Sequence, residues 1–317
     1  DTPGYIDFRG EVTSALRVAD SALLVISAAD GIEVGTKEMW SLAQDNKLPT
    51  IIFVSKLDKD NTEFEATTTE IIDAFGKKCV PIQIPVRSQG NLTDVVSLLK
   101  DNAASTDSNP TWERLIEAIA ETNDDLATKY LEGGELTTEE IMTGLKHGVK
   151  TGEICPVVLG SSPNSIGVKE LLDTILELMP SPLDTGSIEI KATDSEDSST
   201  IEPTKEPRLS VLVFKTTADP YVGKLTYLRV YTGTVKSDSQ IWNSSKEQQE
   251  KISQLFMVRG KSQDNLPELI TGDIGAVAKL NITGTGDTLC NKEKSLTLNG
   301  IKFQDPVLSM ALYPKTK

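Results

Sequence analysis

Three short, uninterrupted apolar runs, separated by segments of helical periodicity, restrict the fold of this chain more than any other feature. The runs cover residues 22–28, 50–54 and 154–159 and are rich in Val, Ile and Leu, as strands buried on both faces are. Residues 36–46 lie between the first two and carry apolar side chains at helical spacing, until Pro49 ends the helix. This order of strand, helix and strand predicts an α/β domain with a parallel sheet.

The third run is followed by a predicted helix over residues 167–179, which Pro180 ends. About 100 residues separate the second and third runs, whereas a simple crossover with its helix needs about 30. We therefore predict a helical insert near residues 88–150 within this first domain. Its expected parts are a polar surface loop over residues 102–110 and helices over residues 111–131 and 138–149.

The second half of the chain has the pattern of a different domain. Residues 187–207 are polar, acidic and proline-bearing, which predicts a linker. Short alternating apolar runs then follow without a convincing helix, and they predict a closed antiparallel β-barrel of about 100 residues. The expected strands cover residues 209–214, 224–231, 240–243, 251–258, 273–280 and 307–312. The predicted division is a first domain over residues 1–186, the linker, and a barrel over residues 208–317.

Composition excludes several classes of function. The chain carries 47 acidic and 32 basic side chains in 317 residues, and a net charge of -15 argues against nonspecific wrapping of nucleic acid, so no DNA partner is expected. Cys79, Cys155 and Cys290 lie far apart, which predicts thiols in a reducing compartment and no zinc site. The single histidine, His147, is expected at the surface. With only this one histidine, a Ser/His/Asp catalytic set is not expected. No apolar run reaches the roughly 20 residues that span a bilayer, so we expect a cytoplasmic protein without a membrane partner.

The chain opens with Asp1-Thr2-Pro3-Gly4, a sequence that suits the phosphate end of a nucleotide site. In a nucleotide hydrolase an aspartate after a strand holds Mg²⁺, usually through water, while a nearby glycine amide meets a γ-phosphate oxygen. Glycine suits that place because no larger residue permits so close a backbone approach. The same four residues also make a good turn, so the segment by itself leaves both interpretations open.

Ser55-Lys56-Leu57-Asp58 follows the second apolar run, at the end of a strand where ligands bind in open α/β sheets. The Asp58 carboxylate only accepts hydrogen bonds, so it suits the two adjacent N–H donors of guanine and does not suit adenine. The stem of Lys56 can lie across the face of the base. Taken alone, Lys-x-Asp is also a solvated charge pair.

Gly160-Ser161-Ser162 follows the third apolar run in the same way. Its backbone amides are expected to meet the carbonyl oxygen of guanine. Because all three polar elements follow strands of one parallel sheet, together they predict a guanine-nucleotide site more strongly than any of them does alone.

The chain resembles bacterial elongation factor G and its elongation-factor-G-like paralogues along its whole length. The similarity is carried by DTPGYIDFRGEVTSALRVADSALLVISAADGIEVGT, SKLD, GSSPNSIGVKELLDTILELMPSPLD, ADPYVGKLTYLRVYTGTVKSDSQIWNS, TGDIGAVAKL, TGDTLC and PKTK. The resemblance implies a P-loop-type GTPase domain that binds GTP or GDP with Mg²⁺, and a barrel that is domain II. It also implies a ribosome-stimulated GTPase whose partners are ribosomal RNA and small-subunit proteins, with Asp1 as the metal ligand.

Several departures from that family limit what this chain is expected to do. No Gly-x-x-x-x-Gly-Lys-Ser/Thr loop and no switch I threonine occur here, so we expect the GTPase domain to be incomplete and this chain alone not to hydrolyse GTP. Without the strand that carries that loop, residues 22–28 are expected to form an exposed apolar edge. Tyr5 stands where the family has a histidine that orients the attacking water, and a phenol with a pKa of about 10 offers no basic nitrogen. Ser55 stands where asparagine is usual, which is expected to cost on the order of 1 kcal/mol of base affinity.

Two hypotheses therefore remain for the whole protein. It is either a GTPase coupled to translocation or a related ribosomal step, or a weakly hydrolysing or non-hydrolysing paralogue that binds the ribosome and guanine nucleotide in a regulatory role. A tRNA-delivering factor of the elongation factor Tu kind fits less well, because the helical insert and the barrel sequence resemble the G type.

Overall fold

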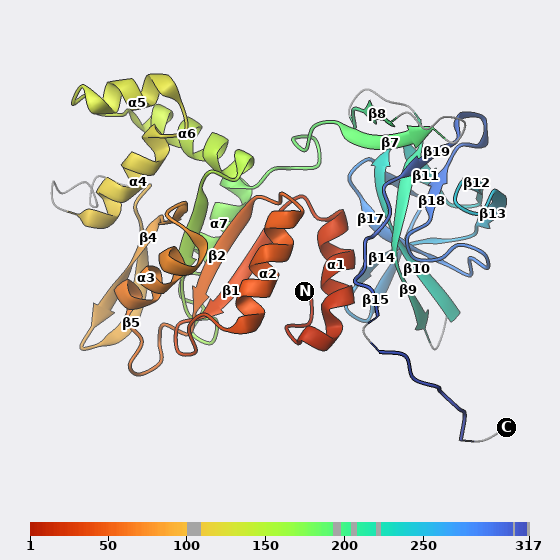
Figure 1. Ribbon diagram of the computed structural model, residues 1–317, viewed down its shortest axis with the longest axis horizontal. Coiled ribbons are helices and arrows are strands. Elements are labelled where there is room, and N and C mark those ends of the chain that lie inside the picture. The colour runs from red at the N-terminus through yellow and green to blue at the C-terminus, as the bar shows by residue number, and fades with distance from the viewer. Residues whose placement is uncertain (100–108, 193–197, 204–207, 220–222, 307, 316–317) are drawn as a thin grey trace. The chain divides into compact units, whose positions relative to one another are not determined.

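The computed structural model describes residues 1–99, 109–192, 198–203, 208–219, 223–306 and 308–315 (Figure 1). The chain groups into two compact units. We call Ala19–Thr185 the α/β unit, and Asp1–Val18 together with Gly186–Lys317 the β-rich unit. Most of the surface loop expected over residues 102–110 lies outside the described residues, as does part of the expected linker.

The α/β unit is built on a four-stranded parallel sheet, so the predicted fold class is confirmed. The strands in their order across the sheet are β1 (Ala22–Ser27), β2 (Thr50–Ser55), β6 (Cys155–Leu159) and β3 (Cys79–Pro81). The sequence predicted the first three. It missed β3, which is only three residues long, and the helix that precedes β3, α3 (Phe64–Phe75).

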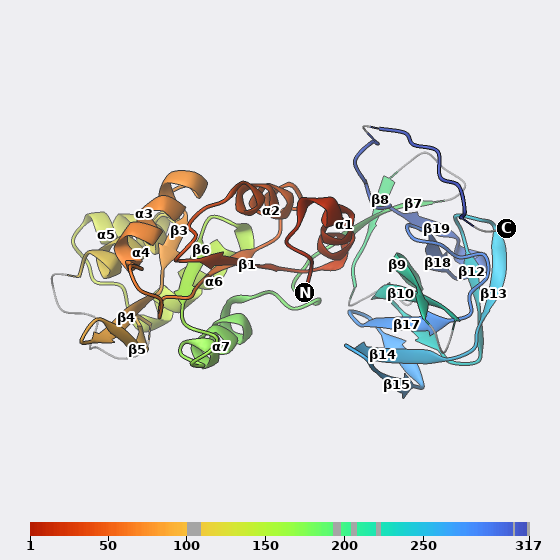
Figure 2. The ribbon, with the colours of Figure 1, turned by 90° about the horizontal axis from the view of Figure 1, so that it is seen from below.

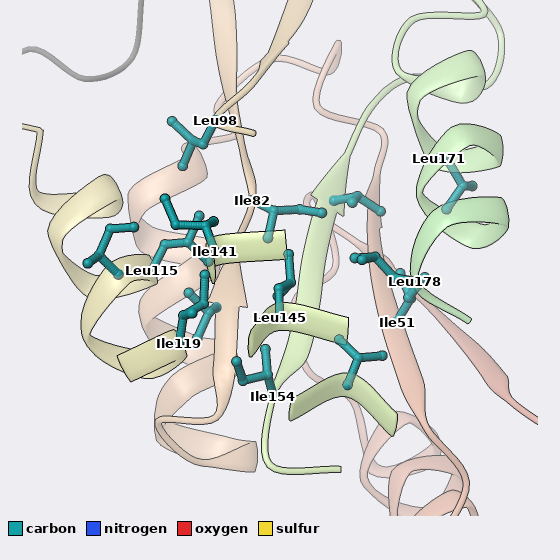
Figure 3. Packing of buried hydrophobic residues seen from close by; sticks show 14 of the residues in the cluster. Ile51, Ile82, Leu98, Leu115, Ile119, Ile141, Leu145, Ile154, Leu171 and Leu178 are labelled. Carbon is teal, nitrogen blue, oxygen red and sulfur yellow. The ribbon is translucent and has the colours of Figure 1, made fainter. Parts of the chain in front are cut away.

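Alternate residues of β2 bury their side chains on opposite faces of this sheet, as the two-residue period of a strand requires. Ile51 and Phe53 pack in a cluster with α7 (Val168–Leu178), part of which Figure 3 shows. Ile52 and Val54 pack with α3 on the other face, where Trp40 of α2 (Val34–Asp45) also lies. Both faces are covered, which explains why the strand sequences are continuously apolar.

Between β3 and β6 the chain forms a hairpin and three helices. These are β4 (Gln83–Ser88), β5 (Asn91–Ser97), α4 (Pro110–Ala120), α5 (Asp124–Leu131) and α6 (Thr138–Thr151). The single helix predicted over residues 111–131 is two helices, because the Asn123 side chain accepts from the Asp125 amide at 2.8 Å and starts a new helix. At the start of α6, the Lys129 ammonium and the Thr137 amide lower the pKa of Glu140 to about 2.

β1 is the first strand in the order of the sheet, and among the described residues it pairs only with β2. It is therefore an edge strand, as expected for residues 22–28. Its side chains Leu23 and Val25 are 44% and 58% exposed. They lie on the same face as Ile51 and Phe53 of the neighbouring strand.

The β-rich unit contains an eight-stranded antiparallel sheet (Figure 2). Its strands are β9 (Ser210–Asp219), β10 (Gly223–Thr232), β12 (Ser239–Asn243), β13 (Gln248–Ile252), β14 (Leu255–Arg259), β15 (Ser262–Leu266), β17 (Ile274–Ala278) and β18 (Thr288–Cys290). β13 and β14 stand far apart in the sheet order, yet Ile252 and Leu255 share one buried cluster. The sheet therefore curls around this cluster, in keeping with the predicted antiparallel domain.

Two smaller sheets complete this unit and correct the expected linker. One pairs β11 (Thr234–Lys236) with β16 (Glu268–Ile270), and the other orders β19 (Leu296–Leu298), β7 (Ile188–Ala192) and β8 (Ser198–Ile201). Residues 187–207 thus contribute two strands where we expected a linker. The reason is a short alternation of apolar and polar residues, which buries Ile190 and Ile201 in a cluster despite the acidic composition.

Two predicted strands of the barrel were wrong. Residues 251–258 do not form one strand but belong to β13 and β14, with a break at Ser253 and Gln254. Residues 308–312, the described part of the predicted last strand, form none. The apolar side chains of Leu308, Met310 and Leu312 are 73% to 98% exposed. The alternation of apolar and polar residues here therefore does not mark a strand with one buried face.

The first helix of the chain packs within the β-rich unit. α1 (Arg9–Val18) lies against β9, and the buried Arg229 guanidinium donates to the Val18 carbonyl at the end of the helix. The Tyr231 hydroxyl donates to the Arg17 carbonyl at 3.1 Å, and the Arg17 guanidinium donates back to that hydroxyl at 2.9 Å. Carbonyls at the end of a helix lack partners within it, so these bonds fasten the helix to β10.

A buried carboxylate holds one loop of this unit. Glu250 accepts from the amides of Asn281, Ile282 and Thr283 at 2.7 to 2.9 Å and from the Thr283 hydroxyl. Burial alone would raise the pKa of Glu250, but these hydrogen bonds outweigh it and lower the pKa. A lowered folded pKa stabilises the protein above the unfolded value of about 4.3, and this stability is lost as the pH falls through the folded pKa.

We therefore expect Glu250→Gln to destabilise the β-rich unit by about 2 kcal/mol at pH 7, because the new amide group faces N–H donors. Thermal unfolding of the complete protein measures this, and the difference from wild type should shrink as the pH falls below the unfolded value of about 4.3 and through the lowered folded pKa of Glu250. The exposed Glu268→Gln is the matched control. A loss of stability that stays the same at every pH would contradict the role given to the ionised carboxylate.

Candidate functional site

The carboxyl ends of β1, β2 and β6 meet at one edge of the parallel sheet. Ser27 pairs in register with Ser55, and Val54 pairs with Leu159. The loops that leave these strands are joined by backbone hydrogen bonds, since the Ala28 amide donates to the Ser55 carbonyl at 2.9 Å. The structure therefore brings two of the predicted polar elements, Ser55 to Asp58 and Gly160 to Ser162, to the same edge.

Lys56 directly follows β2 at this edge of the sheet, and its backbone is left-handed, with φ +60°. Its ammonium lies 3.0 Å from the Asp30 carboxylate, and both side chains are about half exposed. The Ser27 hydroxyl and the Lys56 ammonium both lower the pKa of Asp30. Sequence reasoning missed Asp30, although it follows the end of β1 in the way that Asp58 follows β2. The pair joins the loop that follows β2 to the loop that follows β1.

Asp58 has an unmet hydrogen-bonding capacity. Its Oδ1 atom is buried and has no partner among the described residues. Leu57, directly before it, is fully buried in the core and anchors the loop. A buried carboxylate oxygen without a donor is costly, so the site suits a ligand that brings N–H groups to it. The geometry thus fits the base-reading role predicted for this residue.

The loop from Gly160 to Gly167 folds back closely on β6. A Cβ at Gly160 would lie 2.3 Å from the Ile166 carbonyl oxygen, and a Cβ at Gly167 would lie 2.1 Å from the Leu159 carbonyl oxygen. The Gly160 amide donates to the Val54 carbonyl at 3.0 Å, and the amide of the buried Ser161 donates to Ile166 at 2.9 Å. Both amides are thus occupied within the fold.

Ser162 differs from its two neighbours. It is exposed, and its amide has no backbone acceptor in the part of the chain that the structure describes. Of the three amides predicted to meet the base carbonyl, that of Ser162 is the one open to a ligand. Ser161 instead holds the loop, since its hydroxyl accepts from the Asn164 side chain at 3.3 Å.

Asp1, Gly4 and Tyr5 belong to the β-rich unit and precede α1. All three are exposed, Tyr5 by 78%, and a Cβ at Gly4 would meet no atom within 4 Å. The Tyr5 carbonyl accepts from the Phe8 amide at 3.0 Å and starts a turn of 3-10 helix over Ile6–Phe8. Their roles toward phosphate, metal and water therefore stay predictions. The described residues contain no cluster of three or more His, Cys, Asp or Glu side chains suited to a metal ion.

The cysteines take no part in this site. Cys79, Cys155 and Cys290 are all free and buried. Cys79 and Cys155 are register partners on β3 and β6, and burial raises the pKa of Cys155 well above its ordinary value. A thiol held neutral in this way is a poor nucleophile.

These features define a class of protein: an α/β unit of the GTPase type, with polar loops at the carboxyl edge of its sheet, followed by an antiparallel β-rich unit. Residues 1–181 match the elongation factor Tu GTP binding domain, and residues 208–292 match elongation factor G domain 2. The chain belongs to the family of elongation-factor-G-like translational GTPases.

A crystal structure of a protein from Thermus thermophilus is similar to this chain, with a TM-score of 0.81 and 28% sequence identity. The match covers 100% of this chain and 47% of that protein, so the chain spans about half the length of this solved relative. Within the described residues, no helix combines the length and the apolar character that crossing a membrane requires.

Proposed function

We propose that the complete protein containing this chain binds and hydrolyses GTP on the ribosome, and that hydrolysis is coupled to translocation or a related step in the cytoplasm. The buried, unpartnered Oδ1 atom of Asp58 is the observation that supports guanine binding most directly. The match of the β-rich unit to elongation factor G domain 2 supports a ribosomal partner, through ribosomal RNA and small-subunit proteins.

In this proposal the base is read at the edge of the parallel sheet. The Asp58 carboxylate accepts from the two N–H groups of guanine, and the Ser162 amide donates to its carbonyl oxygen. The Lys56 stem covers the face of the base. Ser55 contributes its hydroxyl, and Ser161 holds the loop.

In the same proposal, residues at the start of the chain contact the phosphates of GTP. Asp1 would hold Mg²⁺ with its carboxylate, usually through water, and the ion would neutralise charge on the phosphates. The Gly4 amide donates to a γ-phosphate oxygen, and its open surroundings leave room for that approach. Tyr5 positions the attacking water through its hydroxyl. Because no phosphate-binding loop occurs in these 317 residues, this chain by itself is expected to bind GTP weakly and not to hydrolyse it.

GTP turnover by the complete protein, measured with and without ribosomes, tests this function. We expect ribosomes to raise turnover by at least about 100-fold, since an external partner completes GTPase sites of this type by factors of that order or more. The isolated 317-residue chain is the control and should show no turnover. Tight GTP binding without ribosome stimulation would reject the proposal and favour the regulatory alternative.

A further inference from the structure

One strand, β4, holds both loops that are proposed to read the base. Gln83 at its start is 1% exposed, and its side-chain oxygen accepts from the Leu159 amide at 3.1 Å. Leu159 is the last residue of β6 before Gly160. The preceding residue of the hairpin, Ile82, still bonds to β6 through its backbone, but its own carbonyl accepts from Leu98. The backbone carbonyl of Ile82 is thus not available to β6, and the Gln83 side chain provides the acceptor for the Leu159 amide in its place.

The other end of the same strand holds the Asp58 loop. The Arg87 guanidinium donates through Nη2 to the Leu57 carbonyl at 3.2 Å and to the Thr62 carbonyl at 2.9 Å. Its Nη1 atom donates to the Gly90 carbonyl at 2.8 Å, which fixes the guanidinium to its own hairpin turn. The pairing of β4 with β5 shifts register between Val86 and Arg87. Such a bulge re-aims the side chain next to it.

The bond to Leu57 falls between the two residues that are proposed to contact the base. Leu57 lies between Lys56 and Asp58, and its carbonyl also accepts from the Thr62 hydroxyl at 3.1 Å. A carbonyl oxygen has two lone pairs, so two donors from different elements use both and fix the orientation of the peptide. Asp58 extends from the backbone next to that peptide.

We infer that Arg87 and Gln83 are positioning residues for guanine recognition. Through them β4 sets the backbone of both loops, so that Asp58 and Ser162 meet the same edge of one base. This inference rests on the proposed guanine site. Neither side chain touches the nucleotide itself.

Inosine diphosphate tests this role because it lacks the 2-amino group of guanine, so Asp58 makes one hydrogen bond to it in place of two. In the complete protein, Arg87→Ala is expected to weaken GDP binding by about tenfold and inosine diphosphate binding by clearly less. The preference for GDP over inosine diphosphate should therefore narrow. Arg87→Lys keeps the positive charge but has a single donor nitrogen, so its effect is expected to fall between wild type and Arg87→Ala. This variant carries the test if Arg87→Ala does not fold. Gln83→Met, which keeps the length of the side chain but removes its amide group and so the acceptor for the Leu159 amide, should weaken binding of both nucleotides because it frees the Ser162 loop.

The exposed Arg114 on α4 provides the matched control, and Arg114→Ala should leave both affinities unchanged. A variant at Arg87 that unfolds at a lower temperature but keeps the wild-type preference for GDP would reduce the residue to a purely structural role and overturn the inference. A wild-type protein that binds ADP as well as GDP would overturn the proposed function instead, and this inference with it.

Discussion

Asp58→Asn is expected to weaken GDP binding by the complete protein about 100-fold. The carboxylate can accept both N–H groups of guanine, whereas an asparagine side chain offers one acceptor and turns its own N–H₂ toward the second donor. Losing one hydrogen bond to a charged group and placing an N–H₂ against the second donor costs about 3 kcal/mol, which corresponds to that factor. Calorimetric titration with GDP measures the loss.

The same change should improve binding of a base with the opposite pattern. Xanthine carries an oxygen where guanine carries the 2-amino group, so the new side-chain amide can donate to it while the amide oxygen accepts from the ring N–H. Xanthosine diphosphate is therefore expected to bind the Asp58→Asn variant better than it binds wild type. Asp60→Asn, in the same loop but exposed, is the control and should change neither affinity. Unchanged GDP affinity in Asp58→Asn would show that the base lies elsewhere.

Gly167→Ala is expected to destabilise the α/β unit by more than about 3 kcal/mol, a size that few single substitutions reach. Gly167 has φ +75°, where a side chain is strained, and an added Cβ would stand 2.1 Å from the Leu159 carbonyl oxygen. That oxygen belongs to the backbone of a central strand and cannot move without disturbing the sheet. Urea denaturation of the complete protein, followed by a probe of this unit, measures the effect.

A second glycine, Gly152, separates the effect of the positive φ from the effect of the close contact. Its φ of +79° is close to that of Gly167, but an added Cβ would meet no atom within 4 Å. Gly152→Ala should therefore cost only the conformational term, about 1 kcal/mol. If both variants lost the same stability, the close approach of the loop to β6 would carry no energy, and the argument for a tightly folded Gly160 to Gly167 loop would be wrong.

The parallel sheet was predictable because β2 and β6 are buried on both faces and leave continuous apolar runs in the sequence, and β1 is equally apolar although one of its faces is exposed. β3 was missed because three residues are too few to form a run, and its place in the sheet depends on pairing with β6. α3 was missed for another reason. Its first half carries Thr67, Thr68 and Thr69, which are poor helix formers, and it folds as a helix because Phe64 and Ile71 pack on the sheet.

The residues proposed to read the base were predictable because they directly follow strands. The residues that position them, Arg87 and Gln83, were not predictable. Asp58 and Lys56 follow β2 within three residues, which is a local signal. Arg87 lies 30 residues beyond Leu57 and contacts the Asp58 loop only through the folded hairpin. The same holds for Gln83 and β6, since 76 residues separate Gln83 from its partner. Nothing in the sequence around either residue records such a contact, because tertiary packing alone creates it.

The attachment of α1 to β10 has a thermodynamic consequence. The carbonyls at the end of this helix depend for their partners on Arg229 and Tyr231, which belong to a strand more than 200 residues further along the chain. The end of the helix therefore stays ordered only while that strand is folded, and loss of these two side chains is expected to make the helix open locally before the sheet unfolds.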